Sequence, residues 1–193
     1  MKGLTDKWWP AEPSRGKWER RLADFYAGNH AYHAMTSSGD KTTHPQARLL
    51  MNLVKPHGAY AEFGCGSGQV CHLVGRVAQA HGFDISPVAI REAMDRKGGS
   101  NACFYVAEAR ACPLPDSSVD GAYSFEMLEH LWDPIAALGE MARVIRPGGF
   151  ILVSCPNRFS LDLHLRKRRP ARWAEIMLAM ARYAQDRVTG TTH

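Results

Sequence analysis

The sequence predicts an α/β fold in which a doubly wound, mainly parallel sheet of about five strands has helices on both faces. Three observations support this prediction. A short apolar run that starts at residue 59 leads into a glycine-rich loop and a helical pattern, and short strand patterns then alternate with helical ones up to residue 155. The chain has 193 residues, 45% of them hydrophobic and 22% charged, which suits one domain, 1–193.

The composition also limits the classes of protein to which the chain can belong. No apolar run approaches the roughly 20 residues needed to cross a bilayer, and the start of the chain lacks the apolar core of a signal peptide. The five cysteines are scattered, odd in number and without a C-x-x-C pair. This pattern favours a reduced, cytoplasmic protein over a disulfide scaffold or a zinc site. The net charge of +5 fits an anionic partner but is also common in enzymes.

The N-terminal segment, 1–44, is expected to form cap helices, because residues 17–34 carry a helical pattern. Its aromatic and histidine residues suit the packing of a helix onto the sheet. A second interpretation, contact of His30, Tyr32 or His33 with a substrate, depends on the family resemblance described below.

The stretch Ala59–Val70 is the centre of the prediction. A short apolar run ends beside an acid, Glu62, and three glycines follow at alternate positions, Gly64, Gly66 and Gly68. This pattern indicates a strand, a tight loop and a helix N-terminus, where backbone N–H groups face an open cleft. The spacing G-x-G-x-G differs from the G-x-G-x-x-G of dinucleotide-binding folds. A carboxylate at this position repels a pyrophosphate and attracts the ammonium group of an amino-acid-like ligand.

The remaining elements follow in alternation along the chain. They are a helix to about Ala80, a very short strand at 81–84, a helix from Pro87, strands at 102–107 and 119–125, a helix with an Asp133-Pro134 cap that the 146–149 turn stops, and a strand at 150–155.

Polar side chains follow the second and fourth strands. Asp84 can accept two hydrogen bonds from ribose hydroxyls, or it can serve as a turn residue. Glu126, Glu129 and His130 stand at i, i+3 and i+4, so one helical turn would place all three on one face. Together they could hold a divalent cation, one of them could act as a general base, or they could cap the turn.

These motifs, in this order, resemble those of class I S-adenosylmethionine-dependent methyltransferases, in particular the type 11 and ubiquinone-biosynthesis O-methyltransferases. The matching segments span about residues 59–158. They are E-x-G-x-G-x-G at 62–68, GFDIS at 82–86, Glu108-Ala109 in place of the usual Asp-Ala pair, CPLPDSSVD at 112–120, EMLEHL at 126–131 and RVIRPGGFILVSCPNR at 143–158.

The resemblance implies a Rossmann-like fold and a site for S-adenosylmethionine, with a cofactor-binding core at 45–158. The cofactor-binding residues that it implies are Glu62 for the ammonium group, Gly64, Cys65, Gly66 and Gly68 for the amino-acid portion, Asp84 for the ribose, Ile85, Glu108 and Ala109 for the adenine, and Phe125. The implied catalytic residues are His130, Glu129 and Glu126, acting alone or with a magnesium or manganese ion held by the three.

The expected function is methyl transfer from S-adenosylmethionine to an oxygen nucleophile, most simply on a small molecule. Two alternatives stay open. One is a catalytically silent partner protein that binds S-adenosylmethionine, and the other is an RNA 2′-O-methyltransferase, because E-x-x-E-H is similar to the metal motif of that class. A nucleotide-dependent oxidoreductase is disfavoured by the glycine spacing.

Beyond Arg158 the resemblance weakens, and 159–193 is expected to form a basic helical tail. The basic run at 166–169 and the amphipathic pattern at 173–183 suit phosphate groups, a membrane surface or a solvated helix end. The complete class I fold has two further strands, for which the sequence shows no room. A truncated fold is therefore expected, with the fifth strand as a bare edge at which two copies can pair.

Overall fold

The computed structural model describes residues 39–96 and 99–155. Its centre is a parallel sheet of five strands in the order β3-β2-β1-β4-β5. The strands are β1 (Ala59–Phe63), β2 (Gln79–Asp84), β3 (Ala102–Val106), β4 (Val119–Phe125) and β5 (Ile145–Ser154). The helices are η1 (Lys41–Thr43), α3 (Pro45–Leu53), α4 (Gln69–Val74), α5 (Pro87–Asp95), η2 (Leu128–His130) and α6 (Pro134–Val144).

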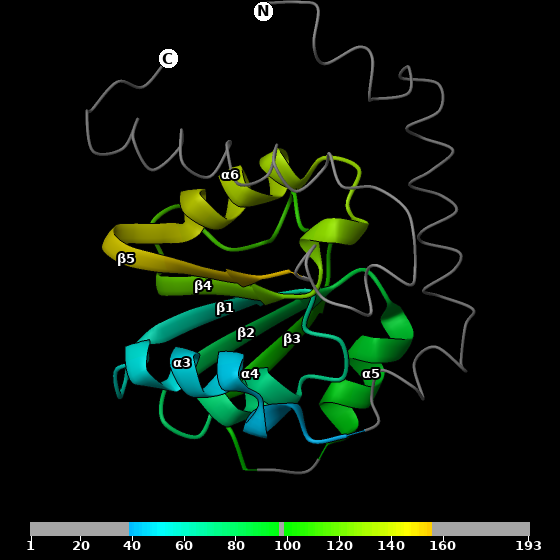
Figure 1. The fold of residues 1–193 in the computed structure, drawn as a ribbon, viewed down its shortest axis with the longest axis vertical. Helices are drawn as coiled ribbons and strands as arrows, with labels where there is room; N and C mark the ends of the chain where they lie inside the picture. Colours follow the sequence, from blue (N-terminus) through cyan, green and yellow to red (C-terminus); the bar gives the residue numbers. More distant parts are fainter. Residues whose placement is uncertain (1–38, 97–98, 156–193) are drawn as a thin grey trace, which may run out of the picture.

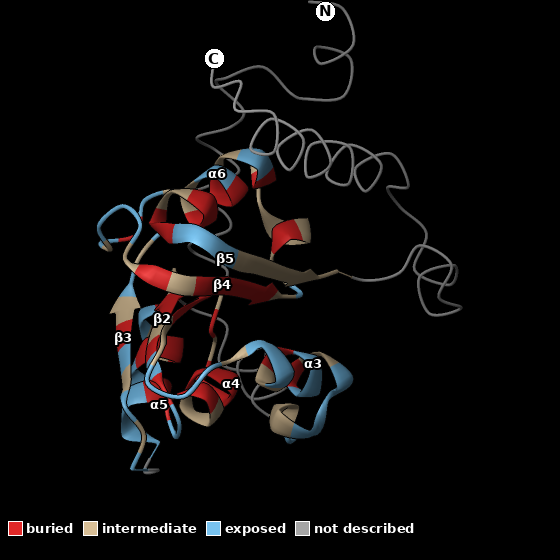
Figure 2. Cartoon of the chain, turned by 90° about the vertical axis from the view of Figure 1, so that its left-hand side faces the viewer, coloured by how far each residue is buried: buried red, intermediate tan, exposed pale blue. Residues whose placement is uncertain are grey.

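The sheet has helices on both of its faces, as Figure 1 shows. Apolar residues of α3, α4 and α5 pack on one face, and those of α6 and η2 pack on the other. Strand β4 is buried along most of its length, whereas β3, at one edge of the sheet, is only partly buried (Figure 2). The predicted doubly wound α/β fold is confirmed. In such a sheet the strand order reverses beside β1, and ligands bind at the carboxyl ends of the strands there.

Several element boundaries agree with the sequence pattern, and two do not. β4 has the predicted bounds, β1 lies within the predicted strand–loop–helix stretch, and Asp133 caps α6 by accepting a hydrogen bond from the backbone N–H of Ala136 at 2.9 Å. The prediction of a helix to about Ala80 is wrong, because α4 ends at Val74 with Gly75 as its C-cap, and β2 already begins at Gln79. The glycine lets the chain pass close to the start of β3, where an added Cβ would lie 3.0–3.2 Å from neighbouring atoms.

The start of β5 also differs from the prediction. The strand begins at Ile145, directly after α6, and the 146–149 turn lies inside it as an irregularity. Val119 pairs with Ile145 and Gly121 with Phe150, so this segment inserts extra residues into β5 opposite β4. Gly148, at a φ of +82°, provides the left-handed conformation that the insertion needs.

Strand β5 forms one edge of the sheet within 39–155. The cap segment before residue 39, including His30, Tyr32 and His33, lies outside the described residues, as do the basic run at 166–169 and the 173–183 pattern. Among the helices that the structure describes, none has the length and apolarity required to cross a membrane.

Candidate functional site

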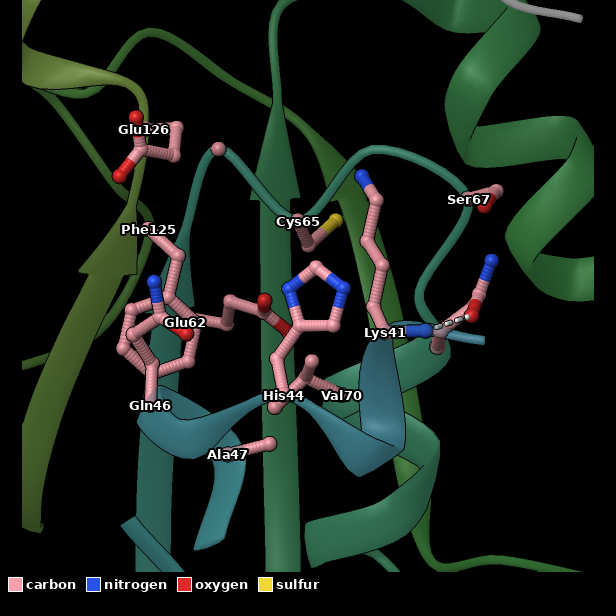
Figure 3. A pocket seen from close by; sticks show the side chains of 12 residues that line it. Lys41, His44, Gln46, Ala47, Glu62, Cys65, Ser67, Val70, Phe125 and Glu126 are labelled. Carbon is pink, nitrogen blue, oxygen red and sulfur yellow. Dashed lines mark hydrogen bonds between the residues drawn. The ribbon is translucent and has the colours of Figure 1, made fainter. Parts of the chain in front are cut away.

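A pocket opens at the carboxyl ends of β1 and β4, as Figure 3 shows. Its walls come from η1, the start of α3, the glycine loop, the first turn of α4 and the residues that end β4. Five of the residues predicted for the site line this pocket: Glu62, Gly64, Cys65, Phe125 and Glu126.

The glycine loop is held in place by the end of β2. The backbone N–H groups of Gly64 and Cys65 both donate to the carbonyl oxygen of Phe83, at 2.8 and 2.9 Å. Gly64, Gly66 and Gly68 all have positive φ values, of +76°, +52° and +73°. A Cβ added at Gly66 would meet no atom within 4 Å, so this Cα faces open space. A ligand can therefore lie against the backbone here.

Glu62 lies at the base of the pocket and is only 4% exposed. The hydroxyl of Tyr123 donates to its carboxylate at 3.4 Å, and the backbone N–H of Cys71 in α4 donates to it as well. Burial raises the pKa of Glu62 to about 8, although the charge of Lys41 acts in the opposite direction. A buried acid with this environment is matched to a cationic ligand group.

Asp84 ends β2 and contacts the glycine loop. Its carboxylate accepts hydrogen bonds from the backbone N–H groups of Gly66 and Ser86, both at 2.9 Å. The turn role considered from the sequence is thus observed. Ile85, the next residue, is half-buried.

Glu108 and Ala109 follow β3 at the same edge of the sheet as Asp84. The two strand ends are joined by the backbone N–H of Ala107, which donates to the Asp84 carbonyl at 3.0 Å. The Glu108 side chain is 50% exposed and forms an ion pair with Arg110 at 2.9 Å. Asp84, Ile85, Glu108 and Ala109 lie outside the lining of the pocket that contains Glu62, beyond the glycine loop.

The expected common face of Glu126, Glu129 and His130 is wrong. Glu126 precedes η2 and has a φ of +54°, so it does not continue into one helical turn with the other two. Ser154 holds it there: its hydroxyl donates to the Glu126 carboxylate and its carbonyl accepts from the Glu126 N–H, both at 3.0 Å. His130 instead lies 3.7 Å from the Glu129 carboxylate. Within 39–96 and 99–155 no three acidic, histidine or cysteine side chains are grouped as a metal site requires.

The comparison with known proteins agrees with this geometry. Residues 61–153 match the family model described as a methyltransferase domain. The matched residues include the glycine loop and all five strands, apart from the ends of β1 and β5.

Two curated relatives illustrate the similarity. One, from Mycolicibacterium smegmatis, is named "Probable S-adenosylmethionine-dependent methyltransferase" and is 32% identical over 126 residues, which are 60% of this chain and 48% of that protein. The other is a ubiquinone biosynthesis O-methyltransferase from Methylococcus capsulatus, 31% identical over 150 residues, 72% of this chain and 62% of that protein. The chain thus spans about half the length of these relatives.

A solved structure supports the fold of the methyltransferase domain. A SAM-dependent methyltransferase from Aquifex aeolicus superposes with a TM-score of 0.66 and 18% sequence identity. The similarity covers 78% of this chain and 85% of that one.

The pocket of the methyltransferase domain also contains residues that the sequence analysis missed. Lys41, His44 and Gln46 reach it from η1 and the start of α3, and Gln69 reaches it from α4. The sequence signalled only one of these residues, because Gln69 is a polar residue at the first position of the helix. Gln69 is only 8% exposed, and its side-chain oxygen accepts a hydrogen bond from the backbone N–H of Lys41 at 2.9 Å.

Proposed function

We propose that this protein binds S-adenosylmethionine in the pocket and transfers the methyl group to an oxygen nucleophile of a small molecule. The observation that carries the proposal is the buried acid Glu62 beside a preformed glycine loop. The match of residues 61–153 to the methyltransferase domain model supports the same reaction class. All five cysteines are free thiols, which supports a reducing, cytoplasmic location.

The residues present fit the cofactor. Glu62 would hold its ammonium group, the glycine loop its amino-acid portion, and the carboxylate of Asp84 its ribose. Ile85, Glu108 and Ala109, at the neighbouring strand ends, would border the adenine. When bound, S-adenosylmethionine supplies a methyl group that its sulfonium already makes electrophilic. The main task of the protein is therefore to align an acceptor and exclude water.

The acceptor side of the site lies beyond β4. Glu126 lines the pocket there, in the left-handed conformation that Ser154 stabilises. We assign proton removal from the acceptor hydroxyl to His130, whose side chain is 43% exposed and can be approached by a substrate. Glu129, 3.7 Å away, would favour the protonated imidazole that results.

The ribose role of Asp84 gives a first test. Asp84→Ala should weaken the binding of S-adenosylhomocysteine by about 1–3 kcal/mol, because ribose hydroxyls lose their acceptor. Titration calorimetry measures this change, and Asp95→Ala, which removes an exposed carboxylate at the end of α5, is the matched control. Asp84→Ala should reduce the affinity for a 2′-deoxy analogue of S-adenosylhomocysteine by less than it reduces the affinity for S-adenosylhomocysteine itself. Equal affinities for the wild type and Asp84→Ala would remove Asp84 from the site.

The role of His130 gives a second test, with an acceptor taken from a panel of phenols. We expect His130→Ala to lower the transfer rate by about 100-fold, the usual contribution of a general base. Activity should persist in EDTA, because a general base needs no metal ion to remove the proton. If EDTA abolishes activity and magnesium or manganese restores it, this assignment is contradicted and a metal-dependent mechanism is supported instead.

A further inference from the structure

One wall of the pocket carries a fixed positive charge. Lys41 extends from η1 along the pocket toward the glycine loop (Figure 3). Among the described residues that line the pocket, it is the one that is cationic throughout the physiological pH range. Glu62 lies in the same pocket with the opposite charge sign when ionised. The lining thus presents a cation and an acid to one ligand.

The backbone of Lys41 is anchored from two directions. Gln69, 28 residues away in α4, accepts the Lys41 N–H at 2.9 Å, the bond drawn as a dashed line in Figure 3. On the other side, the Asp40 carboxylate caps η1 by accepting the N–H of Thr42 at 2.9 Å. The contact with Gln69 joins η1 to the first residue of α4, directly after the glycine loop. The position of Lys41 is therefore coupled to the loop that would bind the ligand.

We infer that Lys41 determines specificity for the carboxylate of the ligand's amino-acid end, and that Gln69 is the residue that positions it. A zwitterionic amino-acid end carries one ammonium and one carboxylate, which correspond to the two charges of the pocket. A charge-assisted hydrogen bond between Lys41 and the carboxylate would stabilise the complex. This inference rests on the proposed function, because it concerns the same ligand.

The mutual influence of the two charges supports the inference. The charge of Lys41 lowers the pKa of Glu62, and among the causes only burial has a larger effect. The two side chains therefore lie close enough to act on one small ligand. Removing Lys41 would weaken the binding of a zwitterionic ligand in two ways. The ligand carboxylate would lose its contact with Lys41, and Glu62 would be more fully protonated and so hold the ammonium group less well. A test must separate these two routes.

Decarboxylated S-adenosylmethionine separates them, because it keeps the ammonium group and lacks the carboxylate. Lys41→Met should weaken the binding of S-adenosylmethionine by about 10-fold or more in calorimetry. It should weaken the binding of the decarboxylated compound clearly less, because only the route through Glu62 acts on that ligand. Arg48→Met removes an equal charge from the exposed surface of α3 and should affect neither ligand. A similar loss for both ligands in Lys41→Met would overturn the inference, because Lys41 would then act through Glu62 alone.

The positioning role of Gln69 has its own test. Gln69→Leu keeps the shape but removes the acceptor, so the preference for S-adenosylmethionine over the decarboxylated compound should shrink by roughly 3-fold or more. Gln69→Glu keeps an acceptor oxygen and should restore the preference. Equal losses for the two ligands in Gln69→Leu would reduce Gln69 to a structural residue. If the wild type binds neither compound, the proposed function itself fails; if it binds both equally, only the present inference fails.

Discussion

Replacing Glu62 by glutamine is expected to weaken the binding of S-adenosylhomocysteine by roughly 10- to 150-fold. This range corresponds to the loss of a hydrogen bond to a charged group, which contributes about 1.5–3 kcal/mol. The change is isosteric, and Glu62 is almost fully buried, so the loss would reflect the missing charge. Glu126→Gln in the same pocket is the matched control for cofactor binding. Comparable affinities of the wild type and Glu62→Gln would show that the ammonium group is bound elsewhere.

The pH dependence follows from the same residue. Because burial raises the pKa of Glu62 to about 8, the carboxyl is mostly protonated at pH 7 in the unliganded protein. The ammonium group requires the carboxylate, so ligand binding should release close to one proton, and affinity should rise between pH 6 and pH 8. Calorimetry in buffers of different ionisation enthalpy counts this proton. Glu62→Gln should release none.

The stability of the unliganded protein should change in the opposite direction. A carboxyl whose pKa is higher in the folded than in the unfolded state favours folding when it is protonated. The stability contributed by Glu62 is therefore largest at low pH and declines as pH rises from its ordinary value of 4.5 through about 8. At pH 8 we expect Glu62→Gln to melt at a higher temperature than the wild type. A lower melting temperature would indicate damage to the fold.

Replacing Gly68 by alanine is expected to lower the free energy of unfolding by about 2–5 kcal/mol. Its φ is +73°, where an L-residue costs about 1–2 kcal/mol. A Cβ there would also lie 2.6 Å from Phe104 and 2.8 Å from Ala93, and overpacking of this kind costs about 1–3 kcal/mol. Urea unfolding of the unliganded protein measures the total change in the free energy of unfolding.

Gly139→Ala is the matched control for Gly68→Ala. This glycine lies in the exposed face of α6, and an added Cβ would meet no atom within 4 Å. The same chemical change should therefore raise stability by about 0.5–1 kcal/mol, because alanine loses less entropy in a helix. Equal effects of the two substitutions would show that the glycine loop is not as tightly packed as its geometry indicates.

Much of the fold could be predicted because strand patterns and loop residues agreed at the same positions. β4 has the predicted bounds and β1 lies directly before the glycine loop as predicted, because short apolar runs end there at polar or glycine-rich turns. The boundary between α4 and β2 could not be predicted, since residues 75–80 continue the helical pattern. Val77 counted toward that pattern, yet it is 42% exposed in the turn before β2. Close approach to β3 at Gly75, a tertiary effect, decides where the helix ends.

The site was predictable where its geometry is local to one loop. Glu62 and the three glycines lie as the motif indicates. The orientation of Glu126 depends on Ser154, and the placement of Lys41 depends on Gln69, and each contact joins residues 28 positions apart. Local spacing carries no information on such contacts, so the common face of Glu126 and His130 was predicted wrongly and Lys41 was missed.

The measurement that tests the account most directly is a competition between S-adenosylhomocysteine and NAD for the full chain, followed by calorimetry. The buried carboxylate of Glu62 and the alternating glycines predict saturable binding of one S-adenosylhomocysteine per chain, which NAD does not displace. Binding of NAD, or no binding of S-adenosylhomocysteine to a folded chain, would contradict the proposed cofactor and with it the assignment of methyl transfer.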